Sequence, residues 1–309
     1  MILRVPVLSV VLLTLCACSP SGGVDWCQSG IPTVEDVRDF YSTDDPSAIS
    51  LGAVLEDSYA LTGDYKGDQR PQLLRALNID PGNVTARQTL LNHCYDFSND
   101  SEREEHCIAG STEELMRLEP ENGFFYFHLS VMAFKRGELS DALTHLQRAA
   151  ALETVSTRWA EQANEFSAVL STYTDDGESC AIYLAVNIAA MNLPRYGPIM
   201  QMCKDQSNEG DEWRQACINA GFALETRGRE LITNSFGASL QKVMYEASGD
   251  TQNAQSAEGR GDQFRKVQQE YMEQIEDEIF DPEYPQNWLD MILEHGELQA
   301  MKLKLEESA

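Results

Sequence analysis

Apolar residues recur at helical spacing along almost the whole chain, and this periodicity limits the possible folds more than any other feature. No run of alternating β-branched residues, the pattern typical of strands, interrupts it. Hydrophobic residues make up 42% of the 309 residues, enough to build a sizeable core. The sequence therefore predicts an all-α fold.

Short motifs locate two helix starts. Asp45 followed by Pro46 is typical of a capping residue with proline at the first helical position. Ser111 and Glu114 have the spacing of a capping box, in which each side chain bonds the other residue's backbone amide. We therefore expect one helix to begin at Pro46 and another just after Ser111.

A finer pattern occupies the segment from Gly123 to Glu153. Residues of matching size and polarity recur there at fixed spacing: Tyr126, Leu129, Ser130, Gly137, Leu139, Ala142, Leu146 and Ala149. This pattern resembles the tetratricopeptide repeat, a 34-residue pair of antiparallel helices. Ala133 and Thr154 depart from the tyrosine and proline of that family. The resemblance implies a solenoid of helical hairpins, in which small residues let paired helices approach closely.

Traces of the same repeat lie on both sides of this segment. Pro81 and Pro120 each end a stretch that resembles the close of such a unit, and Gly221 and Gly228 repeat the spacing of its small residue and turn glycine. We expect a tetratricopeptide-like array over residues 31–174. Carboxy-terminal hairpins and capping helices should follow over residues 175–309, beyond a polar break at 171–179. A second polar break is expected at 248–261, and final helices at 263–280 and 287–305.

The amino terminus has the layout of a secretory signal. A single charge, Arg4, precedes an apolar run shorter than the roughly 20 residues that span a bilayer. Leu15-Cys16-Ala17-Cys18 then resembles the bacterial lipoprotein box, with Cys18 as the modified cysteine. The resemblance implies a signal peptide over residues 1–17, a lipidated tether over 18–30, and acyl chains such as palmitate on Cys18. The alternative is an ordinary signal peptide without lipid.

Ser19 follows the modified cysteine, which in enteric-type bacteria implies sorting to the outer membrane. The resemblance thus implies an anchored protein of the bacterial cell envelope whose folded part faces the periplasm.

Six further cysteines support export, because an even number in an oxidising compartment favours disulfides. Two pairs of nearly matched spacing each enclose a polar connection: Cys94 with Cys107, and Cys203 with Cys217. Cys27 and Cys180 then pair by elimination. The alternative, a zinc site, needs tight C-x-x-C spacing that the chain lacks. We expect structural disulfides, with no metal and no cofactor.

The formal net charge of −27 limits the partners of the chain. Nucleic acid phosphates and anionic lipid headgroups both require a basic surface, so neither is expected to bind. We expect the partner to be an envelope protein or peptide, and the membrane contact to run through the lipid anchor.

No catalytic arrangement is visible in the sequence. The five histidines form no H-E-x-x-H or H-x-H pattern, and Ser239 with Lys242 matches an S-x-x-K string without the K-T-G that accompanies it in serine enzymes. Aspartates and glutamates are so abundant that none can be singled out as an acid pair. The sequence therefore indicates no catalytic residue.

One apolar stripe is a candidate binding site. Phe124, Phe127, Val131 and Phe134 lie beside the packing face of the first repeat helix, at positions that line the peptide-binding groove in tetratricopeptide relatives. The resemblance implies a partner-binding groove there. The alternative is that a neighbouring helix of the same chain covers the stripe. The accessibility of Phe127 distinguishes the two.

These features predict a membrane-anchored periplasmic scaffold or adaptor for envelope biogenesis or assembly. The alternative is a lipoprotein that captures a small ligand or glycan, followed by an enzyme of peptidoglycan turnover. A pocket with converging carboxylates and tryptophans (Trp26, Trp159, Trp213 or Trp288) would favour these alternatives.

Overall fold

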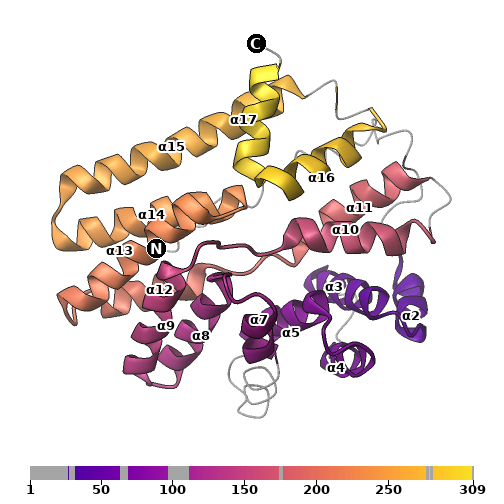
Figure 1. Ribbon diagram of the computed structural model, residues 1–309, viewed down its shortest axis with the longest axis horizontal. Coiled ribbons are helices and arrows are strands. Elements are labelled where there is room, and N and C mark those ends of the chain that lie inside the picture. Colours follow the sequence, from indigo (N-terminus) through magenta and orange to yellow (C-terminus); the bar gives the residue numbers. More distant parts are fainter. Residues whose placement is uncertain are drawn as a thin grey trace. The chain divides into compact units, whose positions relative to one another are not determined.

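The computed structural model describes residues 27, 32–62, 69–96, 111–173, 177–275, 278 and 281–307. Fifteen helices lie in these ranges (Figure 1), and β-structure within them is limited to two isolated bridges. The all-α prediction is confirmed.

The helices of the first half are α2 (Val34–Ser42), α3 (Pro46–Thr62), α4 (Arg70–Ile79), α5 (Val84–Asp96), α7 (Glu113–Leu118), α8 (Phe124–Lys135) and α9 (Leu139–Ala151). Those of the second half are α10 (Trp159–Leu170), α11 (Glu178–Met191), α12 (Gly197–Gln206), α13 (Asp211–Arg227), α14 (Leu231–Ser248), α15 (Thr251–Gln274), α16 (Tyr284–His295) and α17 (Glu297–Glu307).

The chain forms two compact units whose parts alternate along the sequence. Unit 1 consists of Met1–Ser111, Arg158–Leu193 and Ile275–Leu293, and unit 2 of Thr112–Thr157, Pro194–Gln274 and Glu294–Ala309. The expected division near residue 174 therefore falls inside a stretch of unit 1, and each unit draws on both halves of the chain.

Unit 1 is organised around α3, which packs against α2, α4, α5, α10 and α11. Helix α3 begins at Pro46 as predicted, and the Asp45 carboxylate accepts the Ser47 backbone amide at 2.9 Å. Asn192 joins two further helices, since its amide donates to Thr89 on α5 and Gln162 on α10, both at 3.0 Å. These polar links connect α10 to α5, and α10 also packs against α3.

Unit 2 contains the predicted tetratricopeptide-like hairpin, α8–α9. The Ser130 hydroxyl donates to the Ala142 carbonyl at 2.7 Å, so the small residue brings the two helices into close contact. Gly137 lies in the turn with a φ of 78°, a left-handed conformation that favours glycine.

Helices α13 and α14 form a second hairpin of the same kind in unit 2. A Cβ atom on Gly237 would lie 2.5 Å from the Gly221 carbonyl oxygen, and one on Gly221 would lie 2.9 Å from the Gly237 carbonyl oxygen, so both positions require glycine. Helix α13 packs on α9, and α15 packs on α14 (Figure 1). The Arg260 guanidinium joins three helices here, since it binds Glu225 at 2.6 Å and Gln241 at 3.0 Å. This stacking confirms the helical-hairpin, solenoid-like fold class.

Three local predictions were wrong. The capping box at Ser111 does not form: Thr112 precedes α7 without a side-chain cap bond, and Glu114 instead binds Arg117 one turn later at 2.7 Å. The break expected over 248–261 is confined to the turn at Gly249 and Asp250, because α14 ends at Ser248 and α15 runs from Thr251 through the rest of the stretch. The final segment, expected as one helix over 287–305, is divided at Gly296, whose φ of 77° ends α16 before α17 begins.

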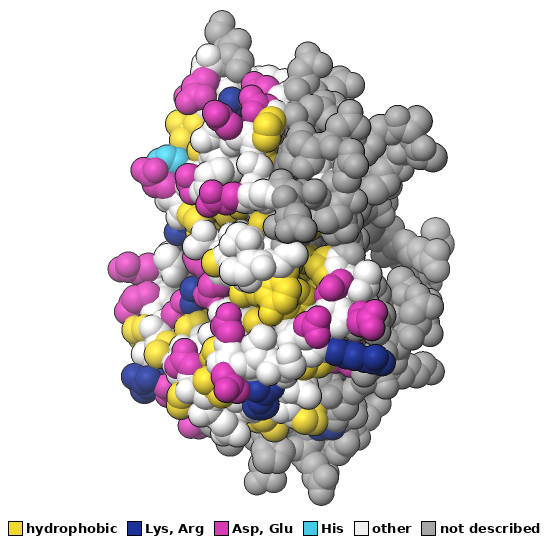
Figure 2. Space-filling view, turned by 90° about the vertical axis from the view of Figure 1, so that its right-hand side faces the viewer, with side chains coloured by type: hydrophobic (Ala, Val, Ile, Leu, Met, Phe, Trp, Pro, Cys, Tyr) yellow, Lys and Arg dark blue, Asp and Glu magenta, His cyan; other side chains and the backbone are white. Residues whose placement is uncertain are grey.

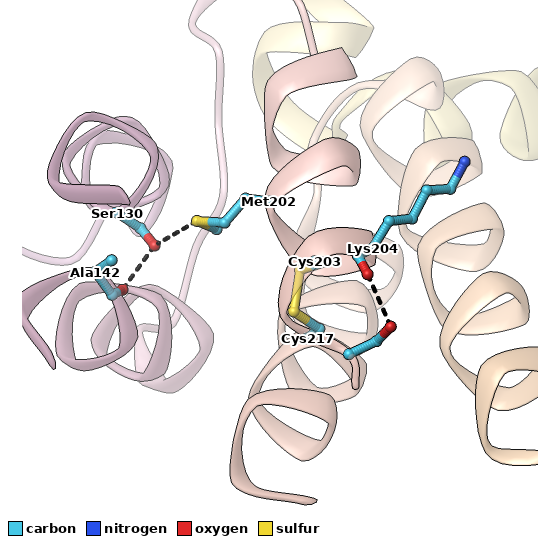
Figure 3. The surroundings of a disulfide bond; sticks show 7 residues. Ser130, Ala142, Met202, Cys203, Lys204 and Cys217 are labelled. Carbon is cyan, nitrogen blue, oxygen red and sulfur yellow. Dashed lines mark hydrogen bonds between the residues drawn. A yellow bond between two sulfur atoms is a disulfide. The ribbon is translucent and has the colours of Figure 1, made fainter. Parts of the chain in front are cut away.

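Two of the predicted disulfides are present. Cys203–Cys217 joins α12 to α13 within unit 2 (Figure 3), and Cys27–Cys180 ties the start of the chain to α11 within unit 1. Two disulfides fit an extracytoplasmic location. Cys107, the side chain of Cys94 and the lipidation candidate Cys18 lie outside the described residues. Within the described ranges, no helix is both long and apolar enough to cross a bilayer.

Candidate functional site

The apolar stripe on α8 is closed in this structure. Phe127 is 0% exposed, Phe124 and Val131 are also buried, and Phe134 is half-buried. Helices α7, α9 and α12 of the same unit all pack against α8. Phe124, Phe127 and Val131 are therefore interior to unit 2 in this structure, and Phe134 is partly exposed.

The packing around α8 shows why the stripe is interior. Figure 3 shows Met202 of α12 pointing at Ser130, with its sulfur 3.5 Å from the hydroxyl oxygen. His128 is buried on the same helix with its ring edge-on to Phe124 at 4.7 Å, and burial lowers the His128 pKa to about 3. A neutral imidazole among phenyl rings belongs to a hydrophobic core.

Unit 1 contains a pocket of about 320 Å³ that the sequence did not predict. It lies where the α2–α3 connection and the start of α3 meet the carboxy-terminal end of α10. Its lining residues are Thr43, Asp45, Ser47, Ala48, Glu165, Ala168, Val169, Thr172 and Tyr173. We call it the Glu165 pocket.

Glu165 is the electrostatically unusual group of this pocket. Burial raises the pKa of its carboxyl above the ordinary value, an effect opposed by the nearby hydroxyls of Thr85 and Ser47 and by the Arg158 guanidinium. Its Oε2 atom is buried, and no described residue donates a hydrogen bond to it. A carboxylate oxygen left in this state is costly unless a ligand or a proton satisfies it.

Tyr173 provides an aromatic wall. Its side chain is 45% exposed, and its ring packs edge-on against the buried ring of Phe40, with centroids 4.6 Å apart. Phe40 thus holds an otherwise exposed phenol at the pocket, where its ring can contact a bound molecule.

Three other polar side chains of the lining bind backbone groups. Thr172 donates its hydroxyl to the Val169 carbonyl at 2.7 Å, Thr43 donates to Phe40 at 3.0 Å, and Asp45 caps α3. These bonds fix the pocket walls and leave Glu165 as the group with unmet bonding capacity.

Sequence signals for this pocket were partial. Asp45 was recognised as a helix cap, and Tyr173 and Thr172 fall in a stretch interpreted as a polar break. Glu165 carries no signal, because one acidic residue among 50 cannot be distinguished by pattern. Of the four tryptophans named from the sequence, Trp26 lies outside the described residues. Trp159 and Trp213 are buried, Trp288 is half-buried, and none of these three lines the pocket. No cluster of three or more His, Cys, Asp or Glu side chains in the described ranges is placed to hold a metal ion.

The chain was compared with protein-family models and with curated protein sequences, and neither comparison gave a match.

Proposed function

We propose that this chain is a lipid-anchored extracytoplasmic binding protein that captures a small polar ligand in the Glu165 pocket. One observation carries the proposal: a pocket of about 320 Å³ is lined by a partly buried carboxylate whose Oε2 has no hydrogen-bond donor among the described residues. Such a concave site with few fixed polar groups suits a small molecule. The proposal places the ligand in this pocket and not on the α8 stripe, because three of the four stripe side chains are buried.

The cellular location is supported by two independent features. The lipoprotein-box resemblance names Cys18 as the anchor, and the two disulfides fit an oxidising compartment. Replacing Cys18 by Ala should release the protein from the outer membrane into the periplasmic fraction. Unchanged membrane association of Cys18→Ala would contradict the anchor.

The capture function is tested by ligand-observed NMR with a panel of neutral sugars, amino acids and alkylamines. We expect at least one compound to bind the wild type and to lose most of its signal with Tyr173→Ala. Phe222→Ala is the matched control, because Phe222 is an exposed aromatic of unit 2. A panel in which no compound binds in a Tyr173-dependent manner would exclude this function.

A protein adaptor is the second candidate, favoured by a different observation. Phe222 on α13 is 53% exposed. Since Gly221 and Gly228 correspond to Ser130 and Gly137 of the first hairpin, Phe222 corresponds to Val131 of the predicted groove. The second hairpin therefore displays an aromatic side chain where the first buries an aliphatic one.

The adaptor function is tested by placing a photo-crosslinking amino acid at position 222 in living cells. A discrete foreign protein in the adducts would support an adaptor. The same amino acid at position 127 is the control, because that side chain is buried and should give adducts within the chain only.

A further inference from the structure

We infer that the ligand of the Glu165 pocket is a primary ammonium ion carried on a short alkyl chain. The inference rests on the proposed function and names the chemical class of ligand that the same pocket would take. Charge, hydrogen bonding and shape each support it.

The charged side chains that line the pocket are both acidic. Asp45 and Glu165 belong to the lining, and no lysine or arginine does. Two guanidinium groups lie outside the lining: Arg158 partly offsets the charge of Glu165, and Arg75 donates to the Tyr41 and Thr43 carbonyls and pairs with Asp44 at 2.9 Å. An anionic ligand would therefore meet two carboxylates without an available cation in the lining, whereas a cation is attracted by both.

The helix ends at the pocket agree with a cationic ligand. The amino-terminal end of α3, which would favour an anion, is already capped by the carboxylate of Asp45 at 2.9 Å from the Ser47 amide. The other wall is the carboxy-terminal end of α10, where the helix dipole is negative. The two ends together favour positive charge.

The unmet acceptor indicates that the cation carries N–H groups. Glu165 Oε2 has no donor, although the carboxylate lines the pocket. In this structure the oxygen is buried, so binding requires the carboxyl group to rotate about its soft terminal torsion until the oxygen faces the pocket. A primary ammonium group can then donate a charge-assisted hydrogen bond, which a quaternary ammonium cannot.

The rest of the lining matches a short alkyl chain. Ala48, Ala168 and Val169 supply apolar contacts, and the exposed Tyr173 ring offers a face to a cation or a methylene group. The net charge of −27 also raises the local concentration of cations around the protein.

Butylammonium is the probe for this inference, with butan-1-ol as its neutral analogue and tetramethylammonium as a cation without N–H donors. Titrations are followed by protein-observed NMR on the full mature chain. We expect butylammonium to bind about tenfold more tightly than butan-1-ol and more tightly than tetramethylammonium, because a buried charge-assisted bond is worth about this factor.

Glu165→Gln separates a role in binding from a role in folding. This variant keeps the shape and should fold normally, and it should weaken butylammonium binding about tenfold without affecting butan-1-ol. Glu161→Gln is the matched control, since it removes the same charge from α10 at a position that does not line the pocket. It should change the affinity less than about twofold.

Three results would overturn the inference: equal binding of butylammonium and butan-1-ol, equal binding of tetramethylammonium, or an unchanged affinity in Glu165→Gln. If any of them occurs while a neutral sugar or an amino acid of the panel binds in a Tyr173-dependent manner, the ligand class is wrong and capture by the pocket stands. If no compound binds in that manner, both proposals fail.

Discussion

The two hairpins of unit 2, α8–α9 and α13–α14, share a helix-pairing pattern but differ in what they bury. The first buries a face of its first helix, and the second buries its turn. In α8–α9 the outer face of the first helix is buried, with Phe127 0% exposed, whereas in α13–α14 the equivalent face presents Phe222 to solvent. The two turns differ in the opposite sense: the first is open and the second is crowded. Gly137 in the first turn has no atom within 4 Å of a built Cβ, whereas a Cβ on Gly228 in the second would lie 2.7 Å from Thr233.

The polar side chains at the two turns also differ in exposure: those of the first turn are exposed, and Glu230 at the second is buried. Arg136 and Glu138 form an exposed ion pair at 2.7 Å beside the first turn, and the Arg136 guanidinium lowers the pKa of Glu138. Glu230 at the second turn is buried and accepts bonds from Ser156 at 3.1 Å, Thr157 at 2.8 Å and Thr233 at 2.9 Å. The spacing of small residues therefore determines that a hairpin forms. The helices that pack around the hairpin determine which part of it becomes interior.

Truncating the two aromatic side chains should give the largest contrast between the hairpins. Phe127→Ala removes a fully buried ring and should lower the free energy of unfolding by about 3 to 5 kcal/mol. Phe222→Ala should change it by less than about 0.5 kcal/mol. Chemical denaturation measures both. A small loss in Phe127→Ala would mean that the stripe is accessible after all.

The buried acids near the second turn should make its stability depend on pH. Glu297 on α17 accepts the Leu231 amide at 2.8 Å, and burial, together with the charge of Glu230, raises the Glu297 pKa to about 7. Because the folded pKa exceeds the unfolded one, the stabilisation is complete below pH about 4.5 and is lost as the pH rises through about 7.

Glu297→Gln provides the comparison, since it mimics the protonated acid at every pH. The unfolding free energy of the wild type relative to this variant should fall by about 3 kcal/mol between pH 4.5 and 7. A constant difference across this range would show that Glu297 has an ordinary pKa.

Removing the Cys203–Cys217 disulfide of the second hairpin should lower the stability of the protein by a similar amount. Cys203–Cys217 attaches α12 to the second hairpin and closes a loop with a sequence separation of 14. Replacing both cysteines by Ala should destabilise the protein by about 3 kcal/mol in the chain-entropy model. Thermal unfolding of the double variant measures this, and an unchanged melting temperature would refute a structural role.

Glycine substitutions should separate close packing from helix propensity. Gly237→Ala places a methyl group against the Glu225 backbone amide and should destabilise the protein by about 2 kcal/mol, despite alanine's better helix propensity. Gly259 on α15 has nothing within 4 Å of a built Cβ, so Gly259→Ala should stabilise by up to about 1 kcal/mol. Equal effects in the two variants would contradict the close approach of α13 and α14.

Much of the fold could be predicted from the sequence, because its signals are local. The Asp45-Pro46 start, the Gly137 turn and the close contact at Ser130 all depend on residues near one another in the chain. Glu114 was misassigned because it had two candidate partners within one turn, and Arg117 bound it instead of the Ser111 amide.

The candidate site could not be predicted for a different physical reason. The Glu165 pocket combines residues 43–48 with residues 165–173, and only tertiary packing of α3 against α10 brings them together. Hydrophobic periodicity predicts which face of a helix is buried. It does not predict which distant segment of the chain packs against that face. Glu165 is distinguished by its burial, which raises the pKa of its carboxyl, and by an oxygen without a donor among the described residues.

The alternation of the two units along the chain has a consequence for synthesis. Unit 1 remains unfinished until Ile275–Leu293 has emerged, and unit 2 until Glu294–Ala309 has followed, so neither can mature as an independent amino-terminal body. Cys203 and Cys217 can meet early, whereas Cys27 waits for a partner 153 positions later. A single cut anywhere between residues 112 and 293 leaves at least one unit divided between the two fragments.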